Sequence, residues 1–260
     1  MTSETGDVVL SERRGNVALL TLNRPAARNA ISPEVSEAMA AALDEIEADD
    51  DARAVVVTGA GEVFCAGADL KVVAQGRGLE IARAKGGFAG LVQRDFPKPV
   101  IAAVNGPALA GGFEIVLSCD LVVAADTARF GIPEAQRGLL AAAGGLIRLP
   151  KRVPLAIALE LAMTGDPIDA ERALALGLVN RVVPRDSVID AALALAERIG
   201  QNSPIAVRLS RQLVREAAQM SEDDGWRRNA ELAVEVFASG DAIEGSTAFA
   251  EKRAPVWRSR

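Results

Sequence analysis

Short apolar runs alternate with amphipathic stretches along the first sixty residues of the chain. Residues 7–23 hold two apolar runs, "VVLSER" and "VALLTLN", on either side of "RGN", and this predicts a β-hairpin. "SPE" at residues 32–34 supplies a capping serine, a proline suited to the first helical position and a first-turn acid, so a helix is predicted from Pro33 to about Ala48. Residues 53–59, "RAVVVTG", are rich in β-branched side chains and predict a buried strand.

The middle of the chain repeats this alternation. Residues 79–94 predict a helix, and "PVIAAVNG" (99–106) and "DLVVAAD" (120–126) predict two further buried strands. A short buried helix is expected between these strands, over residues 111–119, and "LVNRVV" (178–183) predicts a last strand. Strands that alternate with helices favour parallel pairing, so the fold class is expected to be α/β.

After Pro184 the pattern becomes helical. One helical face is formed by Val188, Ala192, Leu195 and Ile199. "SPIAVRLSR" begins a second helix with the Ser-Pro start seen before, and residues 225–239 and 241–252 predict two more. We therefore expect an α/β region over residues 1–195 and a helical region over 196–260.

Composition places the chain among ordinary globular proteins. It has 260 residues, of which 50% are hydrophobic and 25% charged, enough for a large core without disulfides or metals. The net charge of −6 gives no basic footprint for nucleic acid. The longest uncharged runs, residues 99–113 and 138–147, are too short to span a bilayer. No membrane segment and no nucleic-acid partner are expected.

The cysteines and the amino terminus indicate a cellular compartment. Cys65 and Cys119 lie far apart and form no C-x-x-C pair. The first fifteen residues lack a basic start followed by an apolar stretch, so no signal peptide is expected. A cytoplasmic location follows as the expectation.

The chain contains no histidine and no tyrosine. A Ser-His-Asp triad, a Cys-His pair and a histidine-ligated metal are therefore impossible, and no metal site is expected. Acid–base chemistry near neutral pH must come from carboxylates, lysines, cysteines or backbone dipoles.

Two glutamates stand in apolar surroundings. Glu114 is the one charged residue in "ALAGGFEIVL" (108–117), and Glu134 ends "FGIPE" (130–134). A carboxylate among apolar groups is costly unless it is paired or used. Glu114 could instead cap a neighbouring loop, and Glu134 could be a surface acid stabilised by a helix dipole. Two such acids, together with two turns of small residues at 66–68 and 110–112 that can present free amides, suggest proton transfer next to a stabilised enolate.

Two glycine-containing turns are also candidate ligand-binding sites. In "FCAGADLK" (64–71), the small residues 66–68 allow close backbone approach, although Asp69 could simply cap a helix in an ordinary strand-to-helix connection. "VVVTGAGEVF" (55–64) begins like a dinucleotide fingerprint, but Phe64 replaces the third glycine. No second strand ending in an acid follows about 20 residues on, so dinucleotide binding is disfavoured.

Taken together, five stretches resemble the crotonase superfamily, the enoyl-CoA hydratase/isomerase family. They are "LNRPAARNAIS", "FCAGADLK", "VNGPALAGGFEIVLSCD", "ARFGIPEAQRGL" and "FAEKRAPVW", in the family's order from residue 22 to 257. The resemblance implies a spiral of ββα units with a carboxy-terminal helical trimerisation region. It also implies a homo-oligomer, a trimer or hexamer, that acts on an acyl-CoA thioester. Coenzyme A then enters as part of the substrate, and no separate cofactor is expected.

The resemblance also implies roles for individual residues. The amides of Ala68 and Gly111 would form an oxyanion hole for the thioester carbonyl. Glu114 would activate a water and Glu134 would deliver a proton to the α-carbon. The Ala66–Leu70 loop would hold the adenine, and Arg28 and a neighbouring subunit's Lys252 would lie near the phosphates. The full expected set of coenzyme A or substrate contacts is Arg28, Ala66, Gly67, Ala68, Asp69, Leu70, Leu109, Gly111, Phe249 and Lys252.

Departures from the family pattern affect substrate choice. Ala110 stands where relatives often have a first glycine of three, and because Gly111 keeps its amide we expect little loss. "AAAGGL" (141–146) replaces a common P-x-x-G-G-T and suggests a roomier or more apolar acyl pocket. Lack of tyrosine and histidine disfavours the dihydroxynaphthoyl-CoA synthase and aryl dehalogenase branches.

A hydratase acting on trans-2-enoyl-CoA is the main prediction, because two acids can hold a water from both sides. A double-bond isomerase, a dehydratase of a decorated acyl-CoA and a low-turnover acyl-CoA-binding protein remain as alternatives.

Overall fold

The structure is a computed structural model that describes residues 7–258. The first six residues, part of the segment for which no signal peptide was expected, lie outside the described range. Nine strands form two sheets within the described residues: β1 (Val9–Arg14), β2 (Val17–Leu22), β3 (Ala54–Gly59), β4 (Val100–Val104), β5 (Ala108–Leu109), β6 (Leu121–Ala125), β7 (Arg129–Gly131), β8 (Ile168–Asp169) and β9 (Arg181–Val183).

Helices occupy the connections and the tail. The α-helices are α1 (Pro33–Ala48), α2 (Leu70–Ala74), α3 (Gly111–Ser118), α4 (Gly145–Arg148), α5 (Leu155–Thr164), α6 (Ala170–Ala175), α7 (Val188–Gly200), α8 (Pro204–Ala217), α9 (Glu222–Phe237) and α10 (Gly240–Glu251). The 3-10 helices are η1 (Pro25–Ala27), η2 (Gly78–Ala82), η3 (Phe88–Gly90), η4 (Pro133–Arg137), η5 (Leu149–Lys151) and η6 (Arg185–Ser187). No helix in the described part of the chain is long and apolar enough to cross a membrane.

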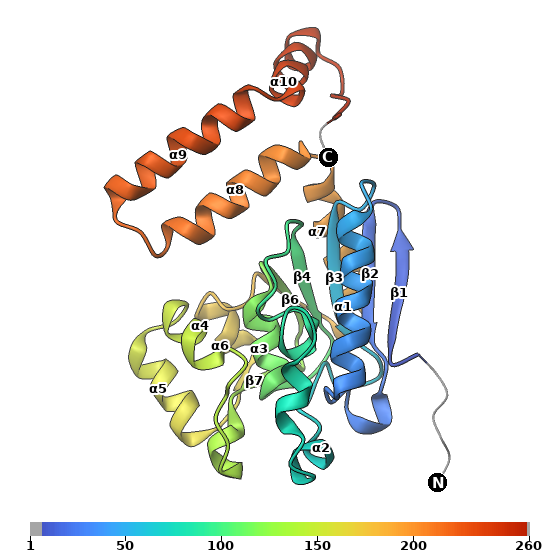
Figure 1. Ribbon diagram of the computed structural model, residues 1–260, viewed down its shortest axis with the longest axis vertical. Coiled ribbons are helices and arrows are strands. Elements are labelled where there is room, and N and C mark those ends of the chain that lie inside the picture. Colours follow the sequence, from blue (N-terminus) through green and yellow to red (C-terminus); the bar gives the residue numbers. More distant parts are fainter. Residues whose placement is uncertain (1–6, 259–260) are drawn as a thin grey trace.

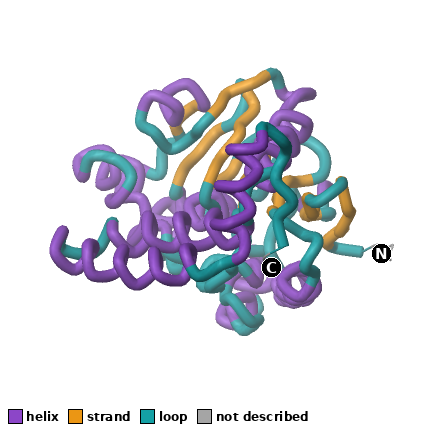
Figure 2. Tube along the Cα trace, turned by 90° about the horizontal axis from the view of Figure 1, so that it is seen from above, coloured by secondary structure: helices purple, strands orange, loops and turns teal. Residues whose placement is uncertain are grey.

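The main sheet has the order β1-β2-β3-β4-β6-β9, and every pair after the β1–β2 hairpin is parallel. All residues of β3 and β4 are buried, as expected for parallel strands covered on both faces. Helix α7 contacts β2, β3, β4 and β6, while α1 contacts β1 and β2. Figure 1 shows α1 in front of this sheet and α7 behind it, and Figure 2 shows from above how helices flank the strands.

Most predicted elements are confirmed. Ser32 caps α1 by accepting a hydrogen bond from the Val35 amide, and Ser203 caps α8 in the same way through Ala206. Helix α9 begins earlier than expected because Ser221 caps it. The parallel α/β class is confirmed as well. Residue 195, the expected boundary between the α/β region and the helical region, lies inside helix α7. The division of the chain into these two regions stays a prediction.

The helix expected over residues 79–94 is wrong. The chain instead forms the two short 3-10 turns η2 and η3, and Gly86, Gly87 and Gly90 all adopt positive φ. A Cβ on Gly90 would lie 2.6 Å from the backbone nitrogen of Ala40 in α1. The apolar residues of this segment therefore pack directly on α1 as an irregular loop, which only glycine allows at these positions.

A second, smaller sheet of β5, β7 and β8 lies beside the main one. Strand β5 follows β4 and runs parallel to β7, with Ala108 opposite Phe130 and Leu109 opposite Gly131. This pairing controls the position of the two segments that leave its carboxyl edge.

Candidate active site

The carboxyl edge of the β5–β7 pair brings the two apolar-flanked glutamates together. Helix α3 leaves β5 and carries Glu114, and η4 leaves β7 and carries Glu134. Because the two strands run in the same direction, both segments start from the same edge of the sheet. The two carboxylates influence one another electrostatically.

Glu114 is held in one position by backbone amides. Its side chain is 3% exposed, and the amide of Gly145 donates to Oε1 at 2.8 Å. A Cβ on Gly145 would lie 3.0 Å from Cγ of Glu114, so glycine allows this close approach. Burial raises the pKa of the Glu114 carboxyl, while the amides of Gly145 and Ala143 and the charge of Arg148 oppose that rise. These donors favour the anionic form.

Glu134 is buried as well, and a backbone amide, its own, opposes the rise of its pKa. It is 9% exposed, and its Oε2 is buried with no hydrogen-bond partner among the described residues. Burial, with a smaller contribution from the charge of Glu114, raises the pKa of Glu134 to about 7. The two carboxyls form a coupled pair, in which the charge of Glu114 raises the pKa of Glu134.

Two backbone amides next to these acids are free. Within the described residues, neither the Ala68 nor the Gly111 amide donates to another protein group. A Cβ on Gly67 would lie 3.0 Å from the Gly111 nitrogen and 2.7 Å from Cβ of Ala110, so the two amide-bearing segments touch. Free amides at a loop and at a helix start can stabilise a developing oxyanion.

Glycines let α3 sit close to its neighbours. A Cβ on Gly111 would lie 2.4 Å from Cζ of Phe88, and one on Gly112 would lie 2.1 Å from the carbonyl oxygen of Cys65. Both are backbone or ring atoms that cannot move aside easily. The start of α3, including the Gly111 amide, is therefore fixed between η3 and the loop before α2.

The expected adenine loop is tied to the segment before α1. The Ala66 amide donates to the Arg28 carbonyl at 3.0 Å, and the Ile31 amide donates to the Gly67 carbonyl at 2.8 Å. The Arg28 side chain is exposed and has no hydrogen-bond or ion-pair partner in the described part of the chain. Arg28 thus lies beside the Ala66–Leu70 loop with its charge available.

Asp69 has a structural role in this arrangement. It caps α2 by accepting from the Lys71 amide at 3.0 Å, and it forms an ion pair with Arg24 at 3.1 Å. The capping alternative considered from the sequence is therefore the observed contact. Leu70, 52% exposed, and the partly exposed Leu109 remain accessible to a ligand.

Phe249 and Lys252 lie elsewhere. Phe249 on α10 is 88% exposed, and Lys252 is the exposed carboxy-terminal cap of the same helix. Figure 1 places α10 and α2 at opposite ends of the molecule, so a single chain does not bring these two residues to the Ala66–Leu70 loop.

Three residues of the site were not predicted. They are Gly145, whose amide holds Glu114; Phe88, which packs on Gly111; and Arg148, which lies near Glu114. The pair of glycines before a short apolar run at residues 144–147 was the one available signal for Gly145. Contacts of Phe88 and Arg148 depend on segments far apart in sequence, so no local pattern indicated them.

In the turn that resembles a dinucleotide fingerprint, the side-chain amides of Asn29 and Asn105 lie against the backbone. A Cβ on Gly59 would lie 2.7 Å from Nδ2 of Asn29, and Nδ2 of Asn105 donates to the Gly61 carbonyl at 2.9 Å. The turn is a junction of buried asparagines. This agrees with the expectation that it binds no dinucleotide.

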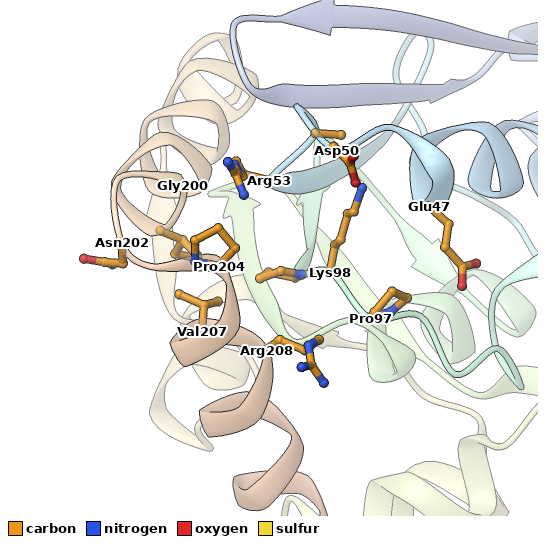
Figure 3. A pocket seen from close by; sticks show the side chains of 13 residues that line it. Glu47, Asp50, Arg53, Pro97, Lys98, Gly200, Asn202, Pro204, Val207 and Arg208 are labelled. Carbon is orange, nitrogen blue, oxygen red and sulfur yellow. The ribbon is translucent and has the colours of Figure 1, made fainter. Parts of the chain in front are cut away.

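A separate cavity of about 150 Å³ lies at the opposite ends of the main strands (Figure 3). Lys98 and Arg53 line it where β3 and β4 begin, together with Pro204 at the start of α8. The Lys98 ammonium donates at 2.6 Å to the carbonyls of Ile46 and Asp49 at the end of α1. Lys98 thereby joins the end of α1 to the segment before β4 beside this cavity.

Comparisons with known proteins agree on one family. A sequence model described as enoyl-CoA hydratase/isomerase matches residues 12–260. Carnitinyl-CoA dehydratase of Proteus mirabilis is 43% identical over 253 residues, covering 95% of this chain and 97% of that protein. Enoyl-CoA hydratase EchA19 of Mycobacterium tuberculosis is 42% identical over 266 positions, covering 100% of this chain and 99% of that protein.

Solved structures give the same result. A crystal structure of enoyl-CoA hydratase from Mycobacterium tuberculosis H37Rv superposes with a TM-score of 0.93 at 45% identity, covering 98% of this chain and all of that one. Carnitinyl-CoA hydratase from Mycobacterium avium gives a TM-score of 0.78 at 48% identity, with coverage of 98% and 100%. The chain belongs to the enoyl-CoA hydratase/isomerase family, and its fold is the crotonase fold.

Proposed function

We propose that this protein is an enoyl-CoA hydratase that adds water reversibly, in syn geometry, across the 2,3 double bond of a trans-2-enoyl-CoA to give a 3-hydroxyacyl-CoA. The observation that carries the proposal is the unequal glutamate pair. Glu114 accepts an amide hydrogen bond, whereas Glu134 has a buried oxygen with no hydrogen-bond partner among residues 7–258 and a pKa of about 7. One acid is thus prepared to accept a proton and the other to give one.

The chemistry follows from these positions. Glu114 takes a proton from a water held between the two carboxyls, and the water oxygen bonds to the β-carbon. The electron pair of the double bond moves onto the thioester carbonyl, where the amides of Ala68 and Gly111 stabilise the enolate. Glu134 then gives its proton to the α-carbon. Loss of one such amide commonly raises the barrier by about 3 kcal/mol.

Coenzyme A enters as part of the substrate, and the proposed steps use no metal ion or organic cofactor. We assign its adenine to the Ala66–Leu70 loop and its phosphates to Arg28 and another subunit's Lys252, which makes the protein a homo-oligomer. Cys65 and Cys119 are buried, free thiols, and this supports a cytoplasmic location.

A dehydratase of a decorated acyl-CoA is the second candidate, because relatives at 43% identity are named carnitinyl-CoA dehydratase. A quaternary ammonium group is typically recognised by aromatic rings. This chain has no tyrosine, both tryptophans, Trp226 and Trp257, lie in the helical tail, and the Phe88 ring beside Gly111 is buried. Residues 141–145, which the resemblance assigns to the acyl pocket, are alanine and glycine, which favours a simple enoyl chain.

The test is the loss of enoyl-thioester ultraviolet absorbance across trans-2-enoyl-CoAs of increasing length, with carnitinyl-CoA assayed in parallel. Rapid loss with one or more enoyl-CoAs supports the hydratase. Glu134→Gln should lower kcat by at least about 10³-fold and still bind coenzyme A. Turnover that survives this substitution contradicts the proposed mechanism. Turnover of carnitinyl-CoA alone would favour the dehydratase.

A further inference from the structure

The backbone that orients Glu114 has few contacts of its own. Residues 139–145 connect η4 to α4, and after two exposed leucines they contain only alanine and glycine. Ala141 is buried, Ala142 is exposed, and Gly144 adopts a φ of +101°. A segment so poor in side chains needs an external support if the Gly145 amide is to stay 2.8 Å from Glu114.

Arg148 supplies that support from the end of α4. One guanidinium nitrogen donates to the Ala143 carbonyl at 3.2 Å, and the other donates to the Val92 carbonyl. A Cβ on Gly144 would lie 2.1 Å from Nη1, so the guanidinium lies directly against this backbone. The planar fork of arginine fits two carbonyls in a way that a lysine cannot reproduce.

The second carbonyl belongs to the segment that supports the oxyanion amide. The Val92 amide donates to the Phe88 carbonyl at 3.3 Å, and the Phe88 ring packs against Gly111. Arg148 therefore joins the segment that holds Glu114 to the segment that fixes the start of α3.

The charge of Arg148 has no partner in direct contact. Among the described residues, no carboxylate lies within ion-pair distance of its guanidinium. The charged and titratable groups that act on it are Arg215 on α8, Arg152 after η5, Glu114 on α3 and Cys119 after α3. The Cys119 thiol is neutral because burial raises its pKa to about 12. Among the described residues that act on this charge, Glu114 is the carboxylate, and the charge of Glu114 in turn raises the pKa of Glu134.

We propose that Arg148 is a positioning residue that gives the two glutamates their different roles. Its fork fixes the 143–145 backbone so that the Gly145 amide stays on Glu114, and its charge adds to the preference of Glu114 for the ionised form. The inference rests on the proposed function for its meaning in catalysis, although the distribution of charge can be tested without it.

The experiment compares Arg148→Gln and Arg148→Lys with the control Arg152→Gln. Arg152 is a half-buried arginine close by in sequence that donates to the Cys119 carbonyl and, among the described residues, makes no hydrogen bond to the 143–145 backbone. For each protein, the pH profile of kcat/KM and the ¹³C NMR titration of the Glu114 carboxyl, assigned by its loss in Glu114→Gln, are measured. Far-ultraviolet circular dichroism checks that each variant is folded.

We expect Arg148→Gln to move the Glu114 titration and the acid limb of the profile to higher pH, with kcat/KM at pH 6 lowered about ten-fold. In Arg148→Lys, the Glu114 titration should stay close to that of the parent protein, because the positive charge is kept. Its kcat should fall, because lysine cannot hydrogen-bond to both carbonyls as the guanidinium does. Arg152→Gln should leave both readouts unchanged. An unchanged Glu114 titration in Arg148→Gln, or an equal shift in the Arg152 control, overturns the inference.

Failure of the two proposals can be told apart. If the parent protein hydrates no enoyl-CoA, the proposed function fails, but the NMR titration still tests Arg148. If Arg148→Gln does not fold, Arg148→Lys is the test. Lysine keeps the positive charge but cannot hydrogen-bond to both carbonyls as the guanidinium does. A shifted Glu114 titration in Arg148→Lys would show that the hydrogen bonds alone, and not the charge, determine the Glu114 titration.

Discussion

At the scale of single residues, Glu134 is needed for the proposed chemistry, but its buried position destabilises the folded state when its carboxyl is ionised. Glu134 is buried with an unsatisfied oxygen, and its pKa rises from 4.5 to about 7. A carboxyl whose folded pKa lies above its unfolded value stabilises the folded state below the unfolded pKa. That stability is lost as pH rises through the folded pKa.

The first prediction follows from this loss of stability as the pH rises. At pH 8 the ionised Glu134 destabilises the fold by roughly 3 kcal/mol relative to pH 4, if the whole shift applies. Glu134→Gln cannot ionise, so it should be more stable than the parent at pH 8 and similar at pH 5. Urea unfolding at both pH values and one protein concentration measures this. Glu171→Gln, an exposed change on α6, is the control and should show no such gain, and equal behaviour of the two variants contradicts the prediction.

Ala110 gives the second prediction. It adopts φ 53° and ψ −130°, a backbone conformation suited to glycine, at the cap of α3. Ala110→Gly should therefore stabilise the protein by about 1 kcal/mol, since relief of strain exceeds the added chain entropy. Because the Gly111 amide is retained, kcat should change less than about two-fold. Thermal unfolding and the hydration assay measure both effects.

The matched control is Ala108→Gly, two residues earlier at a fully buried position of strand β5, where φ is not positive. That change removes a packed methyl group and should destabilise by about 1 kcal/mol. Destabilisation at both positions would show that Ala110 is not strained.

At the scale of elements, the contact of α3 with η3 is one of those that fix the Gly111 amide. The third prediction is that Gly111→Ala lowers kcat by about 10²-fold or more, because its Cβ would meet the Phe88 ring at 2.4 Å and displace the oxyanion amide. Phe88→Leu in the same chain should recover part of the loss by making room. A double-mutant cycle with Phe88→Leu alone measures the coupling. Additive effects would mean that the ring does not position the helix.

The elements also show what could be predicted from sequence. The hairpin, α1, the buried strands and α3 follow local rules of apolar period and capping, and those rules were sufficient. The 79–94 segment failed because its path is determined by close packing of Gly90 on α1, and no local pattern records that contact. The two glutamates were found because a charge in an apolar run is visible locally. Arg148 and Phe88 were missed because their partners lie about fifty and twenty residues away along the chain.

At the scale of the whole molecule, two of the surfaces that expose apolar side chains lie on the helical tail and on α5. The tail presents Trp226, Val234, Phe237, Ile243 and Phe249, each at least 65% exposed. Helix α5 presents Leu155, Leu159 and Met163, which recur at every fourth residue along one face. Exposed apolar surface of this kind marks contact with another chain. Two different surfaces on one chain suit a head-to-tail ring, which agrees with the proposed trimer or pair of trimers.

The fourth prediction concerns Lys252, which lies at the opposite end of the molecule from the loop that it is proposed to assist. Light scattering should give a mass of three or six chains. Lys252→Ala should raise KM for an enoyl-CoA several-fold by removing one phosphate contact, with kcat nearly unchanged. KM for an enoyl-pantetheine thioester, which lacks those phosphates, should not change. Lys85→Ala, an exposed lysine paired with Asp44, is the control.

Mixing variants tests whether the contact crosses between chains. Glu134→Gln chains are expected to be inactive but keep Lys252, and Lys252→Ala chains keep an intact glutamate pair. If Lys252 acts on a neighbouring site, oligomers reassembled from both variants contain sites that combine one chain's Glu134 with another chain's Lys252. Their KM should then fall towards the parent value. If Lys252 serves its own chain, every active site in the mixture keeps the raised KM, because each intact Glu134 belongs to a chain without that lysine.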